Sequence, residues 1–133
     1  MNAQIGISET ELAVLKVLWD YGAGTVREVQ AVLQLQGRTW AYTTVQTLLN
    51  RLQGKGHALC EKGGPAHVYR AAVSREKLLQ NRLHALADEF CEGTASPLVL
   101  ALVEGGSFTP EEIESFRKLL DQLEVDKPRK KRR

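Results

Sequence analysis

Residues 40–56 read WAYTTVQTLLNRLQGKG, and the two sides of this stretch differ in an unusual way. In a helix each residue is turned by about 100° from the last, so side chains three or four positions apart share a side. One side carries the apolar residues Val45, Leu48, Leu49 and Leu52. The opposite side carries Thr43, Thr47 and Asn50, with Gln46 and Arg51 at its edges. The stretch predicts a helix, ended by Gly54 and Gly56, that buries its apolar side and keeps its polar side outward.

The polar side is poorly suited to the single task of keeping a helix soluble. Threonine and asparagine are mediocre helix formers, and a surface helix normally carries Glu and Lys instead. Their short side chains do suit DNA, because asparagine or glutamine can pair with adenine, arginine with guanine, and the threonine methyl group with that of thymine. We interpret residues 40–56 as a recognition helix. The alternatives are a merely solvated polar face, or a face that docks a partner protein without binding DNA.

The segments around this helix complete a recognisable arrangement. Ser8 with Glu11, and Thr25 with Glu28, have the spacing of capping boxes and predict helix starts. Apolar spacing then predicts one helix over residues 9–20 and a second short helix after Thr25. Beyond the recognition helix, ALCEK and AHVYRAAV surround a GGP turn and predict a two-stranded hairpin. Three helices and a hairpin in this order are typical of a winged helix-turn-helix, whose second motif helix lies in the major groove.

The predicted hairpin would form the wing of this first domain, which we place at residues 1–73. A wing lies along the sugar-phosphate backbone, where cations set orientation without reading sequence. Lys62, His67 and Arg70 lie on or beside the hairpin and are the candidates for such contacts. A plain surface hairpin is the alternative.

After residue 73 the sequence is helical throughout and predicts a second domain over residues 74–124. Helix starts or spans are indicated at residues 75–91, Ser96–Pro97 and Thr109–Pro110. A domain this small buries too little surface to be stable alone, so its apolar stripes predict a homodimer. The predicted interface residues are Leu79, Leu83, Leu86, Phe90, Leu98, Leu102, Ile113, Phe116, Leu120 and Leu123. A two-fold dimer would present two recognition helices about one DNA turn apart, which predicts an inverted-repeat, or palindromic, operator in double-stranded DNA. In the alternative, a monomer folds this arm back onto the winged helix.

Charge is divided unevenly along the chain. The net charge is +2 over residues 1–73, −6 over residues 74–126 and +6 over residues 127–133, which read KPRKKRR. The acidic half is a poor surface for nucleic acid, whereas the first half and the basic end are suitable. We predict a disordered basic tail over residues 125–133, which serves either solubility alone or sequence-independent phosphate contacts.

Composition and spacing exclude several classes of protein. No apolar run approaches the roughly 18 residues that span a bilayer, and the N-terminus does not have the pattern of a signal peptide, so we expect a cytoplasmic protein. Cys60 and Cys91 lack the spacing of a zinc ribbon or a disulfide framework. His57, Cys60 and His67 lack a fourth ligand, so we predict no metal site and no cofactor. Three scattered histidines assemble no catalytic constellation, and we do not expect an enzyme.

Five separated blocks of the sequence resemble the penicillinase-repressor family of bacteria, which includes BlaI and MecI and the copper-responsive CopY relatives. The blocks are ISETELAVLKVLW, WAYTTVQTLLNRLQGKG, HVYRAAVS, SPLVLALVE and TPEEIESFRKLL, within residues 7–124. The resemblance implies a dimeric winged-helix repressor that occupies an inverted repeat near a promoter and blocks transcription. By position, the family's recognition-helix contacts match Thr43, Thr44, Gln46, Thr47 and Arg51, and the residue that opens its motif matches Trp40.

The candidate DNA-binding residues are therefore Trp40, Tyr42, Thr43, Thr44, Gln46, Thr47, Asn50, Arg51, Lys62, His67 and Arg70. Within this set, Ala41 and Tyr42 replace the family's Ser-Pro helix opening, and Gln46 stands where some relatives have a basic residue. We expect the operator preference to differ accordingly.

Two departures from the family concern release from DNA. In antibiotic-responsive members, a membrane sensor protease pathway inactivates the repressor by cutting within an LVL-Asn-Phe-VE segment, which here reads LVL-Ala101-Leu102-VE. The resemblance implies cleavage between Ala101 and Leu102, although the residue pair has changed. Copper-responsive members carry paired cysteines near the C-terminus, and none follow Cys91 here, so copper sensing is not expected.

Overall fold

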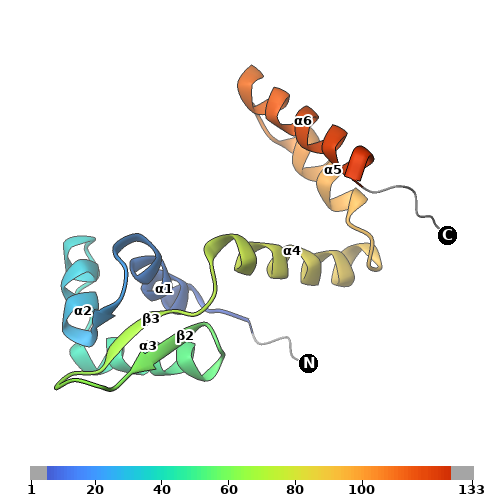
Figure 1. The fold of residues 1–133 in the computed structure, drawn as a ribbon. Helices are drawn as coiled ribbons and strands as arrows, with labels where there is room; N and C mark the ends of the chain where they lie inside the picture. Colours follow the sequence, from blue (N-terminus) through green and yellow to red (C-terminus); the bar gives the residue numbers. More distant parts are fainter. Residues whose placement is uncertain (1–5, 127–133) are drawn as a thin grey trace. The chain divides into compact units, whose positions relative to one another are not determined.

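A computed structural model describes residues 6–126 of the chain, and Figure 1 shows the order of its elements. They are α1 (Glu9–Tyr21), β1 (Gly24–Thr25), α2 (Val26–Leu35), α3 (Tyr42–Gly54), β2 (Ala58–Glu61), β3 (Val68–Ala71), α4 (Arg75–Cys91), α5 (Ser96–Gly105) and α6 (Pro110–Asp126). The predicted class, mainly helical with a small β wing, is confirmed.

The chain divides into two compact units between Leu86 and Ala87, inside α4. The functional domains predicted from sequence, residues 1–73 and 74–124, stay predictions. Helix α6 extends through Asp126, so it includes the first two residues of the predicted tail at 125–133. The remaining tail residues, 127–133, lie outside the described residues.

Three helices begin at capping boxes, in which a hydroxyl and a carboxylate each accept a backbone N–H that the helix itself leaves unpaired. The pairs are Ser8–Glu11, Thr25–Glu28 and Thr109–Glu112. The first two confirm the predicted starts of α1 and α2. The third adds a reciprocal bond at α6, where the sequence indicated only a helix start.

Helix α3 begins at Tyr42, two residues later than the quoted stretch suggested. Ala41 is extended, with φ −67° and ψ 157°, and provides no side-chain cap. The carbonyl group of Trp40 accepts a hydrogen bond from Gln30 Nε2 at 3.1 Å, which holds this residue outside the helix. The C-terminal end is as predicted, because Gly56 has φ +84°, a left-handed conformation that suits glycine after a helix.

A third strand completes the sheet, and the sequence does not predict it. The order is β1-β3-β2, all antiparallel, with Gly24 opposite Tyr69 on one side of β3 and Cys60 opposite Tyr69 on the other. A two-residue strand has no readable alternation, and β1 forms because β3 supplies its partner.

Helices α1, α2 and α3 pack around one core, and the sheet closes it. The buried residues include Val14, Leu15, Val29, Leu33, Val45, Leu49 and Leu52. Tyr69 of β3 and Leu78 of α4 join the same cluster. Nearby, the Trp19 indole N–H donates to the Val73 carbonyl group at 2.8 Å, which fixes the chain where it enters α4.

The second unit contains the end of α4 with α5 and α6, and it has almost no core. No residue of α5 or α6 is buried. Phe108 and Phe116 pack edge to face, with ring centroids 5.2 Å apart. Within the described residues, no helix combines the length and the apolar character needed to cross a membrane.

Candidate nucleic-acid interface

The two sides expected for the recognition helix are present in α3. Val45, Leu48, Leu49 and Leu52 are buried. Thr43, Thr44, Thr47, Asn50 and Arg51 are exposed, and Gln46 is half-buried. Because the apolar side is held in the core, the hydroxyl, amide and guanidinium groups of α3 are available at the surface.

An open groove runs along one flank of α3, facing α1. Its volume is about 390 Å³, and its lining residues are Thr10, Trp40, Thr43, Thr44, Thr47, Leu48 and Arg51. Most of these are predicted DNA-binding residues, so the structure brings Trp40, Thr43, Thr44, Thr47 and Arg51 to one continuous surface.

A second groove, of about 330 Å³, lies between the other flank of α3 and the turn of the wing. Its lining residues are Thr25, Val26, Arg27, Tyr42, Gln46, Pro65, Ala66, His67 and Tyr69. The predicted residues Tyr42, Gln46 and His67 therefore share a surface, although they come from α3 and from the β2–β3 turn.

Asn50 connects α3 to the sheet. Its Oδ1 accepts a hydrogen bond of 2.8 Å from the hydroxyl of Tyr69. Tyr69 is buried, whereas Asn50 is exposed. Burial raises the pKa of Tyr69, and the neighbouring Cys60 adds to the shift, so the hydroxyl stays protonated as a donor at neutral pH. Part of the hydrogen-bonding capacity of Asn50 is thus used to hold the wing against α3.

The wing cations differ in their surroundings. Lys62 and His67 are exposed at the β2–β3 turn. Arg70 also is exposed, and its Nε lies 3.3 Å from a carboxylate oxygen of Glu61 on the facing strand. An exposed pair of this kind is weak and can open for a phosphate group.

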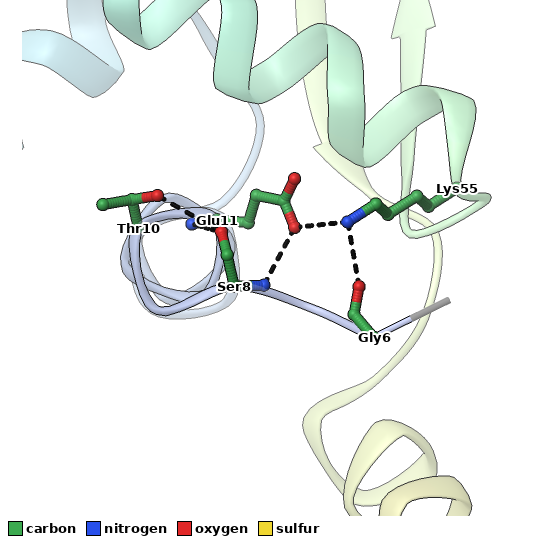
Figure 2. Close-up of polar contacts among 5 residues, drawn as sticks. All are labelled: Gly6, Ser8, Thr10, Glu11 and Lys55. Carbon is green, nitrogen blue, oxygen red and sulfur yellow. Dashed lines mark hydrogen bonds and ion pairs between the residues drawn. The ribbon is translucent and has the colours of Figure 1, made fainter. Parts of the chain in front are cut away.

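Below α3, a buried carboxylate connects its C-terminal end to α1 (Figure 2). Glu11 is 2% exposed, and its Oε1 lies 2.7 Å from Nζ of Lys55, the residue that follows α3. The same ammonium group donates to the Gly6 carbonyl at 2.8 Å, and the Ser8 N–H donates to Glu11 Oε1 at 3.0 Å. Burial by itself would raise the pKa of Glu11, but the hydrogen bonds from Lys55 and Ser8 and the charge of Lys55 together lower it. Glu11 is therefore ionised at neutral pH.

His57 lies next to this ion pair in sequence and in space. Burial lowers its pKa, the charge of Lys55 lowers it further, and Glu11 opposes the shift. Its Nε2 is buried and has no hydrogen-bond partner among the described residues. Within residues 6–126, no group of three or more His, Cys, Asp or Glu side chains, with or without His57, is placed to hold a metal ion.

Most of the predicted dimer residues are exposed in the single chain. The exposed ones are Leu79, Leu86, Phe90, Leu102, Ile113, Phe116, Leu120 and Leu123. Leu83 and Leu98 are half-buried. Ala101 and Leu102, the candidate cleavage residues, are exposed within α5.

Three surface residues near α3 were not among the sequence candidates. Thr10 of α1 lines the first groove, Arg27 of α2 lines the second, and Arg38 lies in the α2–α3 connection. Their positions depend on how α1 and α2 pack on α3, and no local motif indicates them. The aromatic residues at positions 40 and 42 gave an indirect signal for the two arginines, because a guanidinium group can stack on such rings.

A family model described as penicillinase repressor matches residues 7–122. The chain belongs to the penicillinase repressor family. This confirms the resemblance seen in the five sequence blocks, and the family is one of repressors rather than enzymes.

Relatives within the penicillinase repressor family span nearly the same length. The chain is 32% identical over 116 residues to the penicillinase repressor of Bacillus licheniformis, covering 87% of this chain and 90% of that protein. It is 32% identical over 121 residues to the transcriptional regulator BlaI of Mycobacterium tuberculosis (strain CDC 1551 / Oshkosh), covering 90% and 86%. Among solved structures, it is similar to the solution structure of the DNA binding domain of the repressor BlaI, with 35% identity and a TM-score of 0.47 over 53% of this chain and 85% of that one.

Proposed function

We propose that this chain is a homodimeric transcriptional repressor that places α3 in the major groove of an inverted-repeat operator. The observation that carries the proposal is the outward polar surface of α3, formed by Thr43, Thr44, Thr47 and Arg51 around an open groove. Membership in a repressor family supports it. The wing lies next to the other groove, and its exposed Lys62 and His67 would contact the phosphate backbone.

The proposed dimer rests on the second unit. Helices α5 and α6 bury none of their residues, although their sequences carry regular apolar stripes. An apolar surface of this extent usually marks an interface. A second copy of the chain would cover it and place two α3 helices on two half-sites.

We further propose that release from DNA follows cleavage between Ala101 and Leu102. Both residues are exposed in the single chain, although the proposed dimer would cover Leu102. The position of the bond within the proposed interface supports the proposal, because a cut there would weaken the dimer. Because the bond lies inside α5, a protease would have to unwind this helix locally before cutting. Incubation with the cognate sensor system, followed by mass spectrometry, is expected to show a cut at this bond. Release from DNA with an intact chain would rule the mechanism out.

Replacing Arg51 or Thr47 by alanine is expected to weaken operator binding by about 1–3 kcal/mol for each half-site, as for the loss of a good base contact, and the proposed dimer binds two half-sites. Both residues are exposed and line the α3 groove, so the fold and the dimer should be unaffected. Fluorescence anisotropy with the promoter duplex measures the affinity, and sedimentation measures the dimer.

Matched controls for these variants lie away from α3. Arg82→Ala removes an exposed arginine of α4, and Gln34→Ala removes an exposed polar side chain of α2. Both should bind as the parent chain does. If Arg51→Ala and Thr47→Ala also bind the promoter normally, α3 does not contact the operator bases. A protein-docking role for its polar face then becomes the better explanation.

A further inference from the structure

We propose that Arg27 and Arg38 bind backbone phosphates on the two flanks of α3, and that Tyr42 and Trp40 hold their guanidinium groups in place. The proposal rests on the binding of DNA by α3 put forward above. It assigns an affinity role to two residues outside the recognition helix.

Each arginine stacks on an aromatic ring at the start of α3. Arg27 Cζ lies 5.4 Å from the Tyr42 ring centroid, and Arg38 Cζ lies 5.3 Å from the Trp40 ring centroid. At these separations the cation is attracted to the electron-rich face of the ring. Since Tyr42 is the first residue of α3 and Trp40 precedes it by two positions, both positive charges lie beside the first turn.

Neither Arg27 nor Arg38 forms an ion pair with a carboxylate within residues 6–126, although Arg38 lines a groove on α1 together with Glu9 and Asp20. The ion pairs within these residues join Lys55 to Glu11, Arg70 to Glu61, Arg75 to Asp20 and Arg117 to Glu114. Arg75 provides a comparison, because it also stacks on an aromatic ring, with its Cζ 5.1 Å from the Trp19 centroid, and yet Asp20 lies 2.8 Å from its Nη2. Stacking with an acidic partner serves the fold. Stacking without one keeps the guanidinium ordered and available for an anion.

The supporting rings and backbone are themselves held. Trp40 packs against the core, and its carbonyl group accepts the bond from Gln30. The Arg38 N–H donates to the Leu33 carbonyl at 2.9 Å, which fixes the start of the connection. Tyr42 lies in the first turn of α3, which the core holds from below. Ordering the side chains before binding lowers the entropy lost when a phosphate is contacted.

The two stacks lie on different flanks of α3. Tyr42 lines the groove toward the wing together with Arg27 and Gln46, whereas Trp40 lines the groove toward α1 together with Thr44. At about 100° per residue, Thr44 is rotated by about 200° from Tyr42, so the two side chains lie on nearly opposite sides of the helix axis. A helix in the major groove has a phosphate backbone on each side, so one arginine would face each strand.

The test is the salt dependence of binding by Arg27→Met and Arg38→Met. A phosphate contact contributes about 0.9 to the slope of log affinity against log salt on duplex DNA, and the proposed dimer carries each arginine twice, so each variant should lose about 1.8 from the slope. The affinity should fall by the same factor on the promoter duplex and on a scrambled duplex of equal length. Tyr42→Leu keeps the arginine charge, so it should weaken binding by a smaller factor and leave the slope unchanged.

Arg75→Met is the matched control, because it also removes an arginine stacked on an aromatic ring, but one already paired with Asp20. Its salt slope should equal that of the parent chain. Thermal melting of each variant establishes that it is folded.

The outcomes separate this inference from the proposed function. If the parent chain binds neither duplex, the DNA-binding proposal fails and this one fails with it. If the parent chain binds the promoter while Arg27→Met and Arg38→Met keep its slope, only the phosphate role is overturned. A loss confined to the promoter duplex would also overturn it, since that pattern indicates a base contact.

Discussion

Replacing Lys55 by methionine is expected to destabilise the first unit by about 3 kcal/mol, the scale for removing one partner of a buried ion pair. Glu11 is 2% exposed, and the Lys55 ammonium group lies 2.7 Å from its carboxylate. Lys55 itself is 28% exposed, so the carboxylate is the member of the pair that cannot reach water. Urea unfolding followed by circular dichroism measures the loss.

The double variant Glu11→Met with Lys55→Met is the sharpest control. It replaces both charges by apolar side chains of similar length, which is often neutral for a buried pair. We expect it to be more stable than Lys55→Met alone, even though it also loses the bond from the Ser8 N–H to Glu11. If the double variant is as unstable as the single one, the ion pair is not the cause of the loss.

The stability lost in Lys55→Met should depend on pH in a defined way. The pKa of Glu11 is lowered in the folded chain from its ordinary value of 4.5, so its contribution to stability is present above 4.5 and is lost as the pH falls through the lowered value. The difference between the parent chain and Lys55→Met should therefore be largest near neutral pH and shrink on acidification below 4.5. A difference that does not change with pH would contradict the assignment.

Replacing Leu120 by glutamate is expected to raise the dissociation constant of the proposed dimer by at least about 100-fold. Leu120 is 60% exposed in the single chain and belongs to the apolar stripe of α6. Each copy would lose about 1.5–3 kcal/mol of apolar burial, and a two-fold interface counts the change twice. Sedimentation velocity over a concentration series measures the dimer, and anisotropy with the whole operator should show a parallel loss of affinity.

Leu35→Glu is the matched control for this change. Leu35 is 88% exposed on α2, outside the proposed interface, so the same substitution there should leave the dimer intact. A Leu120→Glu chain that dimerises as the parent does would show that α6 is not in the interface. A parent chain that stays monomeric at micromolar concentration would refute the proposed dimer. It would also refute the simultaneous binding of two half-sites of an inverted repeat.

Much of the first unit could be predicted because its signals are local. Capping boxes depend on residues three positions apart, and the helices at residues 9–21 and 42–54 carry their apolar residues at helical spacing. The polar candidates on α3 follow from the same periodicity, since burying one side of a helix leaves the other exposed. The start of α3 was misplaced by two residues because the bond from Gln30 to the Trp40 carbonyl is not a local feature.

Spacing along the chain and blocks of similarity are enough to predict the class of fold, the order of helices and hairpin, the outward side of α3 and membership in a repressor family. Packing determines which distant residues meet: β1 with β3, Tyr69 with Asn50, and Lys55 with Glu11. Such contacts join residues far apart in the chain, so they form only after α1, α2, α3 and the sheet have packed around their common core. Arg27 belongs to this second group, because the packing of α2 on α3 brings it to Tyr42, whereas Arg38 lies two residues from Trp40 and its stacking is a local contact.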